Sequence, residues 1–160
     1  MLARSYALLS SIVLAGAILL TLVLVLLLPA EALAATLTVG TDCPTLAACH
    51  DIANPGDTIQ IPAGTYATNV TITKKLTLNG AGQTSTFLDG EGSHRILSIP
   101  IAVPITLTNL TLQNGAIVTP TGGAVYAAGP LTLDHVAVTD STAPNAGGIW
   151  SGGALQISNS

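Results

Sequence analysis

Four ionisable residues lie close together in the middle of the chain: Asp89, Glu91, His94 and Arg95. Carboxylate oxygens are the ligands that Ca²⁺ prefers, so Asp89 and Glu91 could together hold a calcium ion. The same segment contains Asp-Gly and Glu-Gly, which are turn dipeptides whose charges are usually solvated. We favour the turn and assign no catalytic residue, because acid–base cleavage of a sugar needs two facing carboxyl groups and no second pair offers itself.

Two further ionisable pairs are His50-Asp51 and Asp134-His135. Neighbouring residues of a β-strand point to opposite faces of its sheet, so Asp134 and His135 are not expected to face one ligand. His50 and Asp51 are expected at the end of a short helix, where polar side chains commonly contact solvent. We therefore expect neither pair to be catalytic.

Aromatic side chains are few, and three of them could stack on sugar rings: Tyr66, Tyr126 and Trp150. Tyr126 and Trp150 occupy equivalent places in two similar segments, so their rings are expected to form a ladder. An inward ladder would be core packing, whereas an outward one would be a platform for carbohydrate. We favour the core, and the outward orientation stays open.

The two cysteines, Cys43 and Cys49, are separated by six positions. Within one helix their Cα atoms would lie about 9 Å apart, which is too far for a disulfide. They can pair if Cys43 precedes the helix, which Pro44 favours because proline suits a first helical turn. The spacing matches neither Cys-x-x-Cys nor a zinc pattern, so a structural disulfide is favoured over a redox or metal site.

Charge is scarce along the whole chain, with 8% charged residues and a net charge of −4 in 160 residues. Residues 96–133 contain no Asp, Glu, Lys or Arg. Nucleic-acid binding through a basic patch needs clustered Lys and Arg, so that class of partner is excluded. Low charge also argues against disorder, which pairs low hydrophobicity with high net charge. Neither a cofactor nor a metal is required by any motif.

The N-terminal segment predicts export. Residues 7–28 are an unbroken run of apolar or small residues preceded by Arg4. Small residues follow at the spacing that a signal peptidase reads, so residues 1–34 are expected to be a signal peptide cleaved after Ala34. The alternative is an uncleaved anchor, which would be the chain's only contact with a membrane. Either way, the rest of the chain is predicted to be secreted or held at the cell surface.

The exported part contains one predicted helix, at residues 44–53, which Asn54-Pro55-Gly56 ends. After it come short segments in which apolar residues alternate with Thr, Gln or Ser. Examples are Ile59-x-Ile61, Leu76-x-Leu78, Ile105-x-Leu107, Leu110-x-Leu112, Leu131-x-Leu133 and Val136-x-Val138, each predicted as a separate strand. Alternation with period two indicates β-strands with one dry face and one wet face.

These strands repeat at a longer period. Residues 122–126 recur at 147–150 with an offset of 25. Ile105 matches Leu131 at an offset of 26, and Leu131-Thr132-Leu133 recurs 24 positions later. A self-similarity of this length indicates a solenoid, whereas an antiparallel sandwich, the alternative, gives no reason for it. We predict an all-β, right-handed parallel β-helix of about four turns. Stacked turns also explain the low charge, because like charges would lie about 5 Å apart.

The opening block of the exported part resembles right-handed parallel β-helix proteins of the pectin-lyase-like superfamily. The resemblance rests on residues 43–49, on Asn54-Pro55-Gly56-Asp57-Thr58-Ile59, and on Gly64-Thr65-Tyr66. The Gly-Gly-Ala-Val-Tyr and Gly-Gly-Ile-Trp segments are similar to repeats of polymorphic outer-membrane proteins and adhesins, although they lack the Phe-x-x-Asn element of those repeats. The resemblance covers about residues 42–160 and implies a short helix that caps the solenoid.

The resemblance implies an organisation and two candidate functions. Residues 35–56 are expected to form the cap, and residues 57–160 the turns, which stop without a closing cap as if the chain were a fragment. We expect a non-catalytic surface module in adhesion or glycan binding, with a polysaccharide or a neighbouring cell surface as partner. The alternative is part of a polysaccharide lyase or glycoside hydrolase, in which Arg95 could contact an acidic sugar. The four sequence motifs of polygalacturonase-like hydrolases are absent.

Overall fold

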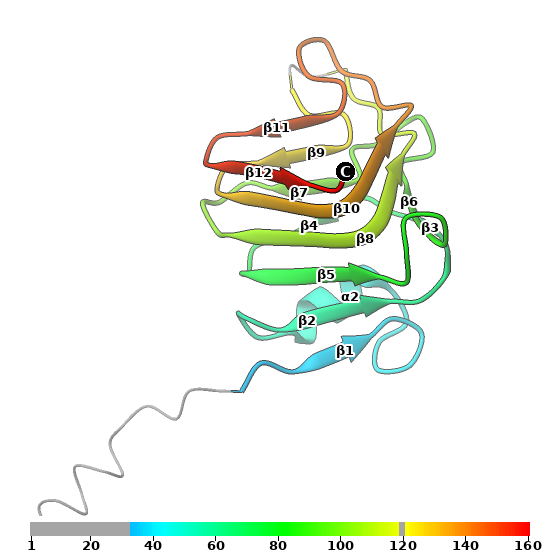
Figure 1. Cartoon of the computed structure of the whole chain (residues 1–160), viewed down its shortest axis with the longest axis vertical. Coiled ribbons are helices and arrows are strands. Elements are labelled where there is room, and N and C mark those ends of the chain that lie inside the picture. The colour runs from blue at the N-terminus through cyan, green and yellow to red at the C-terminus, as the bar shows by residue number, and fades with distance from the viewer. Residues whose placement is uncertain (1–32, 119–120) are drawn as a thin grey trace, which may run out of the picture. The chain divides into compact units, whose positions relative to one another are not determined.

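The computed structural model describes residues 33–118 and 121–160. These residues form a parallel β-solenoid of about five turns with a single short helix (Figure 1). The predicted all-β solenoid is confirmed, and a sandwich is excluded because every strand pair is parallel. Residues 7–28, the expected signal or anchor segment, lie outside the described residues.

The largest sheet stacks one strand from each turn along the solenoid axis, in the order β1-β2-β5-β8-β10-β12 (Figure 1). The strands are β1 (Thr36–Thr38), β2 (Thr58–Ile61), β5 (Leu76–Gly80), β8 (Ile105–Gln113), β10 (Leu131–Thr139) and β12 (Leu155–Ser158). Ile105 pairs with Leu131, and Leu131 pairs with Leu155, as the sequence offsets of 26 and 24 predict. The sequence indicated only about four turns because β1 lies in the segment predicted to be cap.

Two further strand groups complete each turn. β3 (Gly64–Ala67) pairs with β6 (Thr86–Asp89), which pairs in turn with the second half of β8. On another side, β4 (Val70–Thr71), β7 (Leu97–Ile99), β9 (Val125–Ala127) and β11 (Ile149–Ser151) form a separate sheet, called here the third sheet. Each complete turn therefore contributes to three sides.

The core is a stack of aliphatic side chains from equivalent positions of successive turns. Ile59, Leu78 and Leu107 are in register on β2, β5 and β8, and each is 0% exposed. The intervening residues, such as Thr77 between Leu76 and Leu78, face outward and are half-buried. The predicted alternation of dry and wet faces thus holds strand by strand.

At two corners of the solenoid the chain bends within a continuous strand and not in a loop. β8 and β10 each join two strands that the sequence predicted separately, and Asn109 and His135 lie at the junctions with φ of 56° and 52°. Left-handed backbone at a single residue turns the chain without a loop, and Asn tolerates it better than most residues. Space is tight there, because a Cβ at Gly80 would collide with the Asn109 carbonyl.

The helix α2 (Leu46–Ile52) is shorter than the predicted 44–53. It begins after Thr45, whose Oγ1 accepts a hydrogen bond of 3.2 Å from the Ala48 N–H, so Thr45 rather than proline starts it. Cys43 lies ahead of the helix and forms the predicted disulfide with Cys49, with Cα atoms 5.2 Å apart. In the described part of the chain, no helix has the length and hydrophobicity needed to cross a membrane.

Lys74 holds the end of α2 on the first turns of the solenoid. Its Nζ donates to the backbone carbonyls of His50, Asp51 and Ala53 at 2.8, 2.9 and 2.8 Å. The last carbonyls of a helix lack partners within it and carry partial negative charge, which a cation stabilises. One ammonium group therefore satisfies three acceptors.

Replacing Lys74 by Met should lower the free energy of unfolding by about 1–2 kcal/mol, because three carbonyls lose a charged donor. Urea denaturation of the chain measures the change. Lys75→Met is the matched control, since Lys75 is the exposed neighbour and no hydrogen bond links its side chain to another described residue. Equal losses in the two variants would contradict the assignment.

Candidate functional site

Asp89, the first candidate calcium ligand, is the last residue of β6, and its carboxylate accepts hydrogen bonds from other residues of the chain. Its carboxylate accepts hydrogen bonds from Gln113 Nε2 at 2.7 Å and from Asn114 Nδ2 at 3.0 Å, both on the following turn. It also accepts from the Glu91 N–H at 2.7 Å, which closes the turn. The hydrogen bond from Gln113, with those from Glu91 and Asn114, holds the pKa of Asp89 below its ordinary value despite some burial.

Glu91 and Arg95 do not join Asp89 in one site. The Glu91 side chain is exposed, on a residue with φ of 54°. Arg95 instead reaches the next turn, where Nε donates to the Gly122 carbonyl at 2.8 Å and Nη2 to the Thr121 carbonyl at 2.7 Å. Burial lowers the pKa of its guanidinium. Within the described residues no three His, Cys, Asp or Glu side chains gather to hold a metal.

Tyr126 and Trp150 point outward from the third sheet. Both are half-buried, and Tyr126 lies between the buried Val125 and Ala127. Their rings stack with centroids 4.6 Å apart and planes 5° apart, and the Arg95 guanidinium lies 5.1 Å from the Tyr126 centroid. The stacking of the two rings was expected. The favoured position in the core was not, because the rings lie on the outer side of the sheet. The stacking covers one face of each ring, and because β11 is the last described strand of this sheet, no described strand lies over the other face of Trp150.

The two ionisable pairs differ from each other. At Asp134-His135 the positive φ of His135 breaks strand alternation, so Nδ1 of His135 lies 3.2 Å from Asp134 Oδ1 and the two do share a side. Both side chains are largely exposed. His50 is buried, and its Nε2 accepts the Thr73 N–H at 3.1 Å, which ties the cap to the solenoid. The expectation of opposite faces was therefore wrong for the first pair. The expectation of solvent contact was wrong for His50, whose role is structural, and holds for Asp51.

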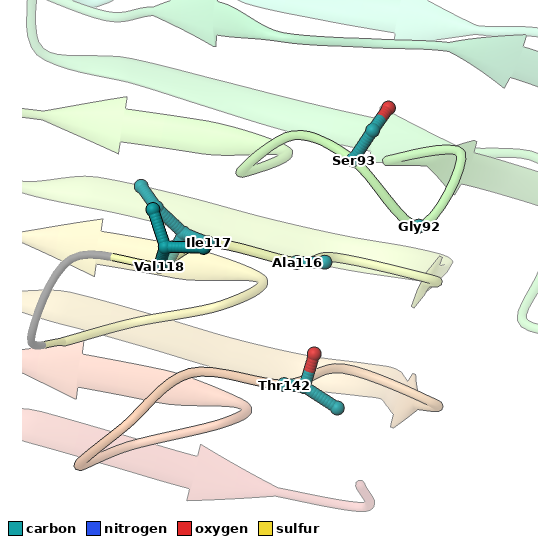
Figure 2. A pocket seen from close by; sticks show the side chains of 6 residues that line it. All are labelled: Gly92, Ser93, Ala116, Ile117, Val118 and Thr142. Atoms are coloured by element: carbon teal, nitrogen blue, oxygen red, sulfur yellow. The ribbon is translucent and has the colours of Figure 1, made fainter.

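A shallow pocket of 270 Å³ lies where loops of three successive turns meet (Figure 2). Figure 2 shows Ala116 on the turn between those of Ser93 and Thr142. The lining residues are Gly92, Ser93, Ala116, Ile117, Val118 and Thr142. None of them titrates near neutral pH, so the pocket offers surface and two hydroxyls but no acid–base pair.

The outer face of the largest sheet carries an array that sequence reasoning missed. Equivalent outward positions align into two columns. The first, called here the threonine column, consists of Thr36, Thr58, Thr77, Thr106 and Thr132. The second, called here the mixed column, consists of Thr38, Gln60, Asn79, Thr108, Asp134 and Ser158. The residue types were visible in the sequence, but the alignment depends on the register of every turn.

The two columns differ in how their polar atoms are satisfied. In the mixed column, Asn79 donates to Gln60 at 2.8 Å and accepts from Thr108 at 2.7 Å. Asp134 accepts from Ser158 at 2.8 Å. In the threonine column, by contrast, no described residue hydrogen-bonds to a side-chain hydroxyl. Those hydroxyls are therefore available to an external partner.

Comparison with protein-family models, curated proteins and solved structures gives no match to this chain.

Asp89→Asn should make stability less dependent on pH in the acid range. Because the folded-state pKa is lowered, the stabilisation by Asp89 is present above the ordinary carboxyl pKa of about 4 and is lost as pH falls through the lowered value. Urea midpoints between about pH 6 and about pH 3 measure this loss. The exposed Asp140→Asn variant is the control. Stabilisation by calcium that Asp89→Asn abolishes would instead indicate a metal site.

Proposed function

We propose that this chain is an exported, non-catalytic surface module that acts in adhesion or glycan binding. The observation that carries the proposal is the outward orientation of Tyr126 and Trp150 on the third sheet. No described residue hydrogen-bonds to Tyr126 Oη or Trp150 Nε1, so both polar atoms are free for a ligand. The indole ring with its N–H, the Tyr126 hydroxyl and the neighbouring Arg95 suit a partner rich in hydroxyl groups.

The engagement of the acidic residues supports a role without catalysis. Asp89 is held by Gln113 and Asn114, and Asp57 is 3% exposed and bound to backbone N–H groups. Glu91 extends into solvent without a facing carboxylate among the described residues. A lyase or hydrolase would require two convergent carboxyl groups or a cation site, and no arrangement of these side chains favours either.

We further propose that the solenoid belongs to the pectin-lyase-like superfamily and that its glycine-aromatic segments are related to polymorphic outer-membrane protein repeats. The parallel solenoid with its short N-terminal helix supports the first proposal. The Pro-Gly-Asp-Thr segment joins the helix to β2, with Gly56 at φ of 103° and Asp57 buried. The pairing of Tyr126 with Trp150 in successive turns supports the second.

Export with cleavage after Ala34 fits the surroundings of Ala35. The Asp57 carboxylate accepts hydrogen bonds from the Ala35 N–H at 2.8 Å and from the Asn54 N–H at 2.7 Å. Cleavage would convert the Ala35 amide nitrogen into an ammonium group facing a buried carboxylate. A charged hydrogen bond of this kind is stronger than the neutral one that it replaces.

Secretion of residues 1–160 should yield a protein whose first residue is Ala35. N-terminal sequencing of the secreted product tests this. Ala34→Leu is the control, because a large residue at the cleavage position blocks processing. Recovery of the wild-type chain at full mass in the membrane fraction would establish the anchor instead.

The secreted chain should bind glycans on an array, and Trp150→Leu should weaken that binding about tenfold, because the indole edge and its stacking are lost. Thr71→Ala, an exposed outward change on the same sheet two strands from Tyr126, is the control. Incubation with acidic polysaccharide should release no product. Calcium-dependent release of unsaturated or reducing-end products would overturn the non-catalytic proposal.

A further inference from the structure

The threonine column is a regular array that extends along the solenoid axis. In-register pairing places Thr58 beside Thr36, Thr77 beside Thr58, and so on to Thr132. Parallel strands lie about 4.8 Å apart, so the five hydroxyls extend over about 19 Å. On β12, the position equivalent to these threonines is occupied by Gln156. The same chemical group therefore recurs at one spacing on five consecutive strands.

The column is preorganised for binding. Threonine is stiff about χ1, so each residue holds its hydroxyl and methyl groups in few orientations and loses little entropy when a ligand binds. Thr58, Thr77, Thr106 and Thr132 are half-buried, which restricts them further. The mixed column, about 6.6 Å away along each strand, is occupied with its own hydrogen bonds between Gln60, Asn79 and Thr108. A ligand on this face would thus meet available hydroxyls in the threonine column and at Thr38, the first member of the mixed column.

The surroundings indicate an uncharged partner. Over β1, β2, β5 and β8 both columns consist only of Thr, Gln and Asn. The one charged member of the mixed column is Asp134, which would repel an anionic polymer. Lys75, just before β5, is a single cation and does not form a row with others. A neutral partner matches this face in charge, and an acidic one does not.

We propose that the threonine column binds one extended, uncharged, β-linked glycan chain lying along the solenoid axis. In an extended β-1,4-linked chain the sugar units follow one another at a spacing slightly longer than that between the strands, and successive units present opposite edges. Each unit meets one threonine, whose hydroxyl exchanges hydrogen bonds with the sugar hydroxyls while its methyl group packs on the apolar C–H surface. This surface lies on a different sheet from Tyr126 and Trp150, so the inference goes beyond the function proposed above.

A repeated site of this kind has a recognisable length dependence. A single neutral hydrogen bond contributes little in water, so binding depends on several turns contacting one chain together. Short oligosaccharides should bind weakly, and affinity should rise with length until the chain spans the column. A pocket that recognises one sugar would saturate at one or two units.

The test uses Thr77→Val with Thr106→Val, which removes two hydroxyls from the middle of the column and keeps the branched shape. The probes are suspended cellulose, chitin and mannan, soluble β-1,4-glucan oligosaccharides of increasing length, and polygalacturonate. The double variant should weaken binding to at least one neutral glycan about tenfold, with an unchanged melting temperature. Thr71→Val, an outward threonine on the third sheet, should stay within about twofold of wild type.

The outcomes separate this inference from the proposed function. If Trp150→Leu weakens glycan binding and the double variant does not, the threonine column is not the binding surface. The proposed function would then still hold. Failure of the wild-type chain to bind any glycan would overturn both. Stronger binding to polygalacturonate than to the neutral glycans would contradict the proposal that the partner is uncharged. The wild-type chain could instead shape ice crystals without binding any glycan, and the double variant could abolish this effect. That result would show that the column binds ordered water and would contradict the proposal of a glycan.

Discussion

The structure depends on one geometric constraint: each turn of the solenoid lies directly on the turn before it, with equivalent residues side by side. Parallel strands about 4.8 Å apart leave no room for like charges in a column, and the face formed by the largest sheet carries almost none. The same constraint fills the interior with one aliphatic residue above another, as in Ile59, Leu78 and Leu107. Core and surface composition therefore have a common cause.

Two carboxylates on the surface accept hydrogen bonds from the following turn. Asp89 accepts from Gln113 and Asn114, and Asp134 accepts from Ser158 and Asn159. These bonds join residues about one turn apart in sequence, so they add side-chain links to the backbone ladder. Asp89 and Asp134 therefore connect neighbouring turns, whereas Lys75 and Glu91 extend into solvent.

The sequence was sufficient for the architecture because register follows from repetition. The offsets between Ile105, Leu131 and Leu155 predicted the pairing of β8, β10 and β12, and helix-breaking residues bounded the cap. Strands β1 and β3 were missed, because Thr36–Thr38 contains one apolar residue and Gly64–Ala67 does not alternate clearly. The Asp134–His135 contact was missed because it depends on a positive φ, which residue type alone does not reveal.

The candidate site was less predictable because it depends on which face each side chain occupies. Alternation around Val125 and Ala127 places Tyr126 outward, whereas a ladder of aromatic rings in the core was the favoured expectation. The threonine column needed the register of five turns at once, since a single threonine between two leucines is ordinary strand sequence. Amide and carboxylate side chains in a stack hydrogen-bond to one another, whereas the hydroxyls of this column do not. In a solenoid that ties its stronger polar groups into links between turns, the threonine hydroxyls are therefore a main source of available surface hydrogen-bonding capacity.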